Sequence, residues 1–310
     1  MFLYKNVGGH MERIELVKGL SFSKIIHGWW RAENWNNSSE ENLRLIEECL
    51  KLGITTFDHA DIYSGGICEE LFGKVLSLKP ELRNKIEIVT KCGITFIHPN
   101  MPKNNGHYYD TSYEHIMYTV NKSLKGLQTD YIDLLLIHRP DIFMNPLEVK
   151  KAFEELKSTG KVRHFGVSNF TPSQFEMLQS YLDFPLVTNQ LELSVVSLDN
   201  FDNGSIENAM KHRIKPMAWS PLNGGKLFSE TSEKYIRLRK ALEEVQLETG
   251  ASSISEIAYA WLCCHPSGIM PITGSKDINR IIEAKNALNI KLNRKQWFKI
   301  LDANRGYEVP

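Results

Sequence analysis

The chain has 310 residues, of which 42% are hydrophobic and 24% are charged, so it can bury a large core and is globular, not disordered. Lysine plus arginine and aspartate plus glutamate each number 37, for a formal net charge of zero, which excludes a global electrostatic attraction to nucleic acid or anionic lipid. The five cysteines form no CxxC pair, which argues against a zinc knuckle or a disulfide framework.

The N-terminal segment, MFLYKNVGGHMERIEL, is the first feature along the chain. It lacks the basic-then-apolar pattern and the cleavage site of a signal peptide. No apolar stretch approaches the roughly 20 residues of a membrane span. We therefore expect a cytoplasmic protein with neither a membrane nor a nucleic acid as partner.

Short apolar or β-branched runs alternate with amphipathic segments along the chain, a pattern that builds a parallel sheet covered by helices. The predicted strands are Ser23–His27, Thr55–Asp58, Ile86–Lys91, Ile132–His138, His164–Val167, Leu186–Asn189, Pro216–Trp219 and Ile269–Ile272. No composition break or Pro/Ser-rich linker divides them, so residues 1–310 are expected to form one domain. Eight strand and helix pairs without a linker favour an α/β fold of the (β/α)8 TIM-barrel type over an open doubly wound sheet.

Helix starts and additional elements complete this prediction. Ser38, Thr171 and Ser253 are each followed three residues later by Glu or Gln, the spacing of a capping box. Two extra amphipathic helices are expected, at about residues 232–248 and 293–303. Residues 11–21 form an expected hairpin that caps the bottom of the barrel.

Polar side chains end three successive strands, where the working residues of a barrel are found. Asp58 ends the second strand, with Tyr63 five residues later, Lys91 ends the third and His138 ends the fourth. Each residue taken alone is more often a solvated loop residue or part of a structural pair. Four together at one barrel mouth indicate a catalytic site.

These residue types suit the reduction of a carbonyl group. A phenol with a pKa near 10 is a poor proton donor at neutral pH, and the ammonium of Lys91 would lower the pKa of Tyr63. Asp58 would hold Lys91 charged and in place, and His138 could hydrogen-bond the substrate oxygen as it gains negative charge. Alternation along the strand turns the adjacent residues His59 and Asp61 away, so we interpret both as structural.

The motifs FDHADIYSGG, TKCG, LLLIHRPD, GKVRHFGVSNF, TNQLE, MAWSPLNGG and PITGSKDINRIIEA occur in this order along nearly the whole chain. In this the chain resembles the aldo-keto reductase superfamily, and within it the bacterial oxidoreductase subgroup, whose barrels are monomeric or weakly associated. The resemblance implies NADPH-dependent reduction of aldehydes or ketones to alcohols by hydride transfer, with Tyr63 as general acid. Asp58, Lys91 and His138 complete the catalytic tetrad that it implies.

The resemblance also implies a site for the nicotinamide cofactor. The residues assigned to the carboxamide, the nicotinamide ring, the pyrophosphate loop and the end of the first strand are Ser168, Asn169, Gln190, Trp219, Ser220, Pro221, Leu222, Gly28 and Trp29. Trp219 stands where many members of the superfamily have a stacking tyrosine, and it keeps a flat surface there.

Residues after the eighth strand indicate which cofactor is bound. The chain has no GxGxxG after a strand and no phosphate loop. Gly274-Ser275-Lys276 instead precedes a helix that carries Arg280 and Glu283, and a hydroxyl, amides at a helix start and two cations suit a 2′-phosphate. This favours NADP(H) over NAD. Because Gly274 stands where relatives have lysine, we expect Lys276 and Arg280 to replace that cation, and Glu283 to meet the adenine.

Aromatic residues are the candidates for the substrate pocket. Tryptophans follow the first strand, and the long loop after the third strand carries Phe96, His107 and Tyr108. We assign Trp30, Trp35 and Tyr108 to an apolar pocket over the nicotinamide. The expected site is open, with a broad preference for aldehydes or reactive ketones.

Two other classes of function stay open at this point. The first is a catalytically weak, cofactor-binding regulatory module with the same fold, against which the complete tetrad counts. The second is a metal-dependent barrel hydrolase that uses His59 and His138. It lacks the His-x-His strand end and the further ligands that such sites require, so we expect no metal.

Overall fold

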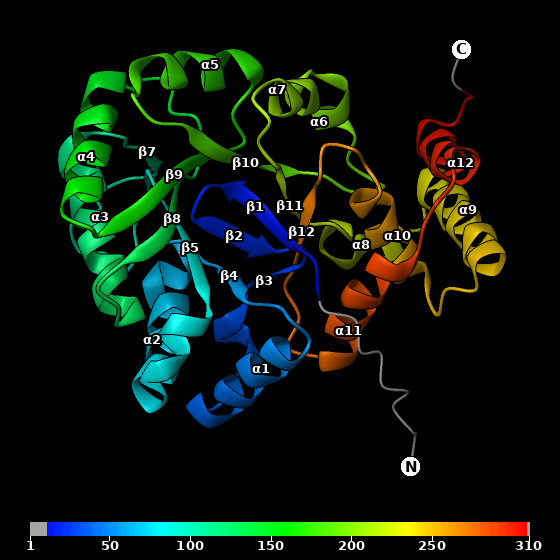
Figure 1. The fold of residues 1–310 in the computed structure, drawn as a ribbon, viewed down its shortest axis with the longest axis horizontal. Helices are drawn as coiled ribbons and strands as arrows, with labels where there is room; N and C mark the ends of the chain where they lie inside the picture. Colours follow the sequence, from blue (N-terminus) through cyan, green and yellow to red (C-terminus); the bar gives the residue numbers. More distant parts are fainter. Residues whose placement is uncertain (1–10, 309–310) are drawn as a thin grey trace.

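A computed structural model describes residues 11–308, and at its centre eight parallel strands close into a barrel (Figure 1). In order around the barrel, the strands are β3 (Ile26–Gly28), β4 (Thr56–Asp58), β5 (Glu87–Cys92), β8 (Ile132–Ile137), β9 (Val162–Ser168), β10 (Leu186–Glu192), β11 (Met217–Trp219) and β12 (Met270–Thr273). The predicted (β/α)8 barrel is confirmed. Residues 1–10, most of the segment compared with a signal peptide, lie outside the described residues.

Helices surround the barrel as an outer ring (Figure 1). The connecting helices are α1 (Ser39–Lys51), α2 (Ile67–Leu78), α3 (Tyr113–Leu127), α4 (Pro146–Ser158), α5 (Pro172–Tyr181), α7 (Ser205–Lys211), α10 (Ile254–Cys263) and α11 (Ile278–Asn286). Two of the three predicted capping boxes are complete, at Ser38 with Glu41 and at Thr171 with Gln174. At the third, Ser253 accepts from the N–H of Glu256, but the Glu256 carboxylate accepts from the N–H of Ser252 instead of that of Ser253. Each box satisfies backbone N–H groups that the first helical turn leaves unpaired, which fixes where the helix begins.

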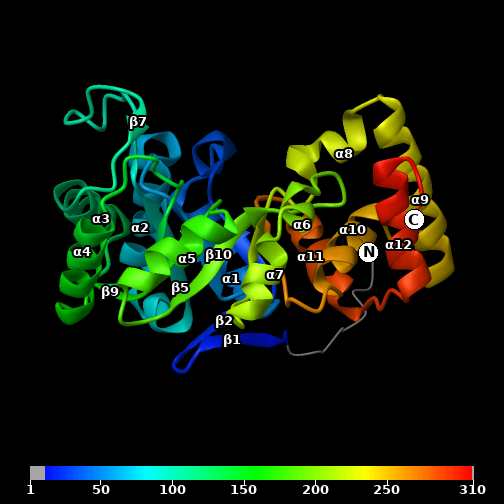
Figure 2. The same ribbon diagram turned by 90° about the horizontal axis from the view of Figure 1, so that it is seen from above.

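The lower end of the barrel is closed by the predicted hairpin of β1 (Arg13–Val17) and β2 (Leu20–Ser23). Leu20 and Phe22 are buried against the apolar side chains of the barrel interior, among them Val89 and Leu134. Figure 2 shows this hairpin at the opposite end of the barrel from β7 and α8. The bottom of the barrel is therefore packed, and only the upper end can hold a ligand.

The predicted first strand, Ser23–His27, is wrong at its boundary, because Ser23 ends β2 and the barrel strand begins at Ile26. The Ser23 hydroxyl donates to the carbonyl of Ile25 at 2.7 Å and accepts from the backbone N–H groups of Thr55 and Thr56 at 3.2 Å each. These bonds turn the chain between hairpin and barrel. Because the Ser23 side chain forms its hydrogen bonds within this turn, the hydrophobicity pattern of the sequence does not reveal where the strand ends.

Two extra helices lie side by side at the edge of the barrel in both views, α9 (Glu233–Thr249) and α12 (Arg294–Arg305). They confirm the predictions for residues 232–248 and 293–303. The indole of Trp297 in α12 stacks on that of Trp261 in α10, with ring centroids 4.6 Å apart. Within residues 11–308, no helix combines the length and the apolar character needed to cross a membrane.

Smaller elements were not predicted. They are the short helices α6 (Asp199–Asp202) and α8 (Lys226–Ser229) and the two-stranded sheet of β6 (Ile94–Thr95) and β7 (Tyr108–Tyr109). The β6–β7 sheet closes the base of the long loop after β5, which projects from the upper end of the barrel (Figure 2).

Candidate active site

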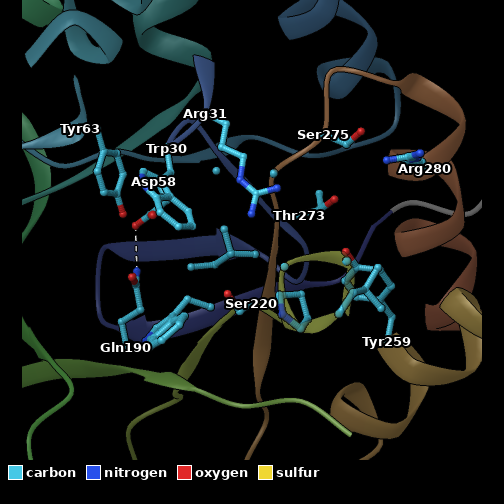
Figure 3. Close-up of a pocket in the computed structure, with 18 of the residues that line it drawn as sticks. Trp30, Arg31, Asp58, Tyr63, Gln190, Ser220, Tyr259, Thr273, Ser275 and Arg280 are labelled. Atoms are coloured by element: carbon cyan, nitrogen blue, oxygen red, sulfur yellow. Dashed lines mark hydrogen bonds between the residues drawn. The ribbon is translucent and has the colours of Figure 1, made fainter. Parts of the chain in front are cut away.

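A pocket of about 980 Å³ opens at the upper end of the barrel, where the strands end. Figure 3 shows Tyr63, Asp58 and Gln190 at one end of it and Ser275 and Arg280 at the other. The volume is at the top of the range typical of ligand sites, about 300–1,000 Å³. An elongated ligand larger than a simple aldehyde therefore fits this pocket.

The four residues of the predicted tetrad converge at one end of this pocket. Lys91 Nζ donates to both carboxylate oxygens of Asp58, at 2.9 and 2.8 Å, to the carbonyl of His59 at 2.7 Å and to Oη of Tyr63 at 3.0 Å. The ammonium is buried and its donors are fully used. Since Tyr63 accepts from Lys91, its own O–H stays available to a ligand.

The strands explain this convergence. Asp58, the last residue of β4, pairs in register with Val89 of β5. Lys91 lies two residues beyond Val89, so alternation points both side chains to the barrel interior. The long side chain of Lys91 thus extends along the apolar interior and reaches Asp58 at the strand ends.

Tyr63 is placed by a turn that needs glycine. The next three residues, Ser64, Gly65 and Gly66, all have positive φ, at 50°, 63° and 96°. A Cβ on Gly65 would lie 2.0 Å from Nδ1 of His98 in the long loop after β5. The sequence YSGG is therefore required both by the left-handed backbone and by the close packing of that loop.

Of the pKa values of Lys91 and Tyr63, that of Tyr63 differs from the sequence prediction. Burial acts to lower the pKa of Lys91, but Asp58 and Tyr63 more than offset it and hold the pKa above 10.5. For Tyr63, burial raises the pKa above 10.0, and Lys91 opposes this without reversing it. The expected net lowering of the Tyr63 pKa is wrong for the protein alone, because desolvation of the phenolate outweighs the ammonium.

His138 lines the pocket beside Tyr63, with the two rings 5.9 Å apart in an edge-on arrangement. Burial, reinforced by the charges of Lys91 and Arg139, holds the pKa of His138 well below 6.5, so the ring is neutral. Its Nδ1 atom is buried without a hydrogen-bond partner in the described residues. A neutral ring next to Tyr63 can donate one hydrogen bond into the pocket.

The amide and hydroxyl side chains predicted for the carboxamide form one hydrogen-bonded network beside the tetrad. Gln190 Nε2 donates to Oδ1 of Asp58 at 2.8 Å, and Ser168 Oγ donates to the backbone carbonyl of Gln190 at 2.9 Å. Asn169 Nδ2 donates to Oγ of Ser168 at 2.7 Å, and Asn169 Oδ1 accepts from Nε1 of Trp219 at 3.0 Å. All four side chains line the pocket, with their positions fixed by one another.

The predicted loop Ser220-Pro221-Leu222 and Gly28 also line the pocket. Ser220 has a φ of 51°, and Asn223 and the two glycines after it also have positive φ. A Cβ on Gly28 would lie 2.7 Å from a methyl group of Ile272. Glycine at this position therefore lets β3 pack closely against β12 beneath the pocket.

The far end of the pocket lies at the start of α11. Gly274, Ser275, Arg280 and Glu283 line it, as predicted. The guanidinium of Arg280 is 74% exposed, and its one ion pair with the described residues is a long one with Asp277, at 3.9 Å. It is therefore available to an anion.

Lys276 does not join this group, contrary to prediction. Its Nζ donates to the backbone carbonyl of Trp35 at 2.7 Å, and its side chain does not line the pocket. Of the two cations predicted here, only Arg280 lines the pocket.

Three aromatic assignments are also wrong. Trp29 and Trp35 are buried in the core, with ring centroids 5.2 Å apart, and Trp29 also packs on Phe72 at 4.8 Å. Tyr108 lies in β7, outside the pocket lining, and its hydroxyl donates to Asn105 at 3.0 Å. Trp30 does line the pocket, with its ring 6.4 Å from that of Tyr63.

Two arginines of the pocket were missed from the sequence, Arg31 and Arg139. Each directly follows a predicted site residue, Trp30 or His138, which was the available signal. The guanidinium of Arg31 lies 5.2 Å from the centroid of the Trp30 ring and projects over the middle of the pocket (Figure 3). The apolar walls contributed by Phe228 and Tyr259 were missed too, because they come from α8 and α10.

The two histidines of the hydrolase hypothesis do not share a site. His59 is fully buried, with its ring 5.8 Å from Trp29 and 4.5 Å from Phe72. His138 lines the pocket, whereas His59 does not. The interpretation of His59 as a core residue fits this placement.

Comparison with known proteins agrees with this site. A sequence model of the aldo/keto reductase family matches residues 24–305. The chain is 55% identical to "Uncharacterized oxidoreductase YcsN" of Bacillus subtilis (strain 168), over 97% of this chain and 100% of the relative. It is 42% identical to a "6-dehydroglucose reductase" of Agrobacterium fabrum, over 96% of this chain and 100% of the relative.

A solved structure shares the fold. The aldo-keto reductase AKR11C1 from Bacillus halodurans, in its holo form, matches with a TM-score of 0.80 at 23% identity, covering 97% of this chain and 98% of that one. The family match spans the barrel and every residue of the tetrad. The chain therefore belongs to the aldo/keto reductase family and is an oxidoreductase.

Proposed function

We propose that this protein reduces aldehydes or ketones to alcohols with NADPH, and that Tyr63 is the general acid. The contact between Lys91 Nζ and Tyr63 Oη, 3.0 Å long, is the observation that carries the proposal. It puts a cation beside the oxygen on which a phenolate would form, at the wall of a pocket of about 980 Å³.

The pocket residues fit a nicotinamide cofactor. Ser168, Asn169 and Gln190 offer amide and hydroxyl groups held by one network. The indole of Trp219 would lie against the ring, and Arg280 at the far end would bind the 2′-phosphate that distinguishes NADPH from NADH. When bound, the reduced nicotinamide supplies the hydride that the carbonyl carbon gains.

The proton comes from the protein. The hydroxyl of Tyr63 donates to the carbonyl oxygen and transfers its proton as that oxygen gains negative charge, so hydride and proton together convert the carbonyl to an alcohol. Lys91 stabilises the phenolate left behind, and Asp58 keeps Lys91 in place. The neutral ring of His138 donates a second hydrogen bond to the same oxygen. This bond lowers the barrier to reduction of the carbonyl, and His138 stays neutral throughout.

The experiment is NADPH consumption by the wild type and by Tyr63→Phe, with aldehydes, diketones and quinones as substrates. The name of the Agrobacterium relative adds 6-dehydroglucose to this panel. We expect turnover by the wild type and a loss of at least about 100-fold in Tyr63→Phe, with NADPH still bound. Unchanged turnover in Tyr63→Phe would refute the mechanism, and cofactor binding without turnover of any substrate would favour a regulatory module.

A further inference from the structure

We propose that Arg139 and Glu192 form a hydroxyl-binding subsite at the substrate end of the pocket, which selects small, neutral, polyhydroxylated carbonyl compounds. This inference rests on the proposed function and names the substrate class of the same site. It replaces the apolar pocket that the aromatic residues led us to expect, of which only Trp30 is present.

Arg139 supplies hydrogen-bond donors that no described residue uses. It follows His138 directly, lines the pocket and is half-buried. Its guanidinium lies 5.6 Å from the centroid of the Trp219 ring and interacts electrostatically with His138 and Glu192, but it forms no hydrogen bond or ion pair with the described residues. A guanidinium has five N–H groups in a fixed plane, and a half-buried one without an acceptor is poised to bind a ligand oxygen or water.

Glu192 supplies the matching acceptor. It is the last residue of β10, two residues beyond Gln190, so alternation places both side chains on the interior face of the strand. Glu192 pairs in register with Trp219, over which Arg139 lies. Its half-buried carboxylate lines a separate polar recess of about 380 Å³ and forms neither a hydrogen bond nor an ion pair with the described residues.

The charges favour a neutral ligand over an anionic one. Arg139 and Glu192 are close enough to interact electrostatically, yet they do not pair directly, so each keeps its hydrogen-bonding capacity. A hydroxyl group both donates and accepts, and can therefore use both residues. A carboxylate or phosphate bound to Arg139 would instead face Glu192 and the neighbouring Asp199. Two cations line the same recess as Glu192, but both are engaged: Lys234 donates to the carbonyl of Val196, and Arg305 pairs with Asp202.

The experiment compares kcat/KM for three probes with NADPH: D-glyceraldehyde, propanal, which has the same carbon chain without the hydroxyls, and the anionic succinic semialdehyde. The variants are Arg139→Met, Arg139→Lys and Glu192→Gln, with Arg294→Met on the exposed start of α12 as matched control. Thermal unfolding of each variant checks that it is folded.

We expect the wild type to prefer D-glyceraldehyde to propanal by about 10- to 100-fold, as for hydrogen bonds to charged groups. Arg139→Met should remove most of this preference, Arg139→Lys and Glu192→Gln should remove part of it, and Arg294→Met should keep it. Equal ratios in wild type and Arg139→Met would overturn the subsite. So would a wild-type preference for succinic semialdehyde that Arg139→Met abolishes.

A binding measurement separates this inference from the proposed reaction. Isothermal titration of the NADPH-loaded protein compares D-sorbitol with 1,6-hexanediol, neither of which NADPH can reduce. Sorbitol should bind more tightly to the wild type, and Arg139→Met should remove the difference. If no aldehyde or ketone is reduced but this difference holds, the reaction is wrong and the subsite stands; if the two bind equally to the wild type, the subsite is wrong.

Discussion

Lys91 donates a hydrogen bond from its buried ammonium to Oη of Tyr63, over 3.0 Å. This one contact joins the two effects that set the chemistry of Tyr63. Burial raises the pKa of the phenol, which keeps it protonated and ready to donate, and the ammonium stabilises the phenolate once the proton has left. Neither effect alone gives a useful general acid in a buried site.

Replacing Lys91 with methionine should therefore reduce kcat by about 10²- to 10⁴-fold, because the phenolate would form in a buried site without a cation. Binding of NADPH, measured by quenching of tryptophan fluorescence, should change much less, since Lys91 lies behind Tyr63 and Asp58 and does not line the pocket. A loss of NADPH binding as large as the loss of kcat would show instead that Lys91 supports the shape of the pocket.

The pH dependence of reduction should be nearly flat between about pH 6 and 9. His138 has a pKa well below 6.5 and so stays neutral throughout this range, while the pKa of Tyr63 lies above 10.0, so the acid stays protonated. The rate should fall only at more alkaline pH, as Tyr63 loses its proton. The measurement is kcat/KM for one aldehyde across this range, and a break near pH 6.5 that disappears in His138→Asn would contradict a neutral histidine.

Selection of NADPH over NADH should depend on Arg280. Arg280→Met should weaken NADPH binding by about five- to tenfold, a modest effect because the guanidinium is 74% exposed and screened by water. Binding of NADH should hardly change, since it has no 2′-phosphate. Lys276→Met is the matched control, because Lys276 is bonded to the carbonyl of Trp35 and faces away from the pocket. Equal losses for both cofactors would place the 2′-phosphate elsewhere.

The barrel and the tetrad could be predicted because strand periodicity and strand-end polarity are local signals. Asp58, Lys91 and His138 each end an apolar run, and closure of the sheet then brings the strand ends together. The direction of neighbouring side chains in a turn has no such signal. Trp29 and Trp30 have the same side chain, but one packs in the core and the other lines the pocket.

The net pKa shift that results from opposing effects also could not be predicted from the sequence. The pattern correctly suggested that Lys91 would be near Tyr63, but the direction of the net shift in the Tyr63 pKa depends on how deeply both residues are buried.

The positions of Lys276 and Arg280 also could not be separated from the sequence, because they are only four residues apart. The geometry of the turn decides that, of these two cations, Arg280 reaches the pocket and Lys276 does not.

The contribution of Glu69, a carboxyl group outside the pocket, to protein stability should fall as the pH rises from about 4.5 to about 7. Buried histidines such as His27, whose pKa burial lowers to about 4, act in the opposite direction over this range, so the effect of Glu69 is measured as the difference between the wild type and Glu69→Gln. Glu69 of α2 is 2% exposed, and its Oε1 accepts from Oγ1 of Thr90 at 2.6 Å. Burial, partly opposed by hydrogen bonds from Thr90 and Ser123, raises its pKa from 4.5 to about 7. The nearby Asp61, also buried, has its pKa raised in the same direction.

Because the folded chain holds the Glu69 proton more tightly than the unfolded chain, the stabilisation is complete below pH 4.5 and lost as the pH rises to about 7. The loss amounts to about 3 kcal/mol at one pKa unit per 1.36 kcal/mol. Glu69→Gln keeps the shape of the protonated acid but cannot ionise. Urea unfolding at pH 5 and pH 8 should thus show Glu69→Gln gaining on the wild type at the higher pH. The neighbouring Glu70→Gln, exposed on the same helix, should keep the wild-type difference between the two pH values. If Glu69→Gln does the same, Glu69 is ionised in the folded protein, and its charge is compensated by the groups around it.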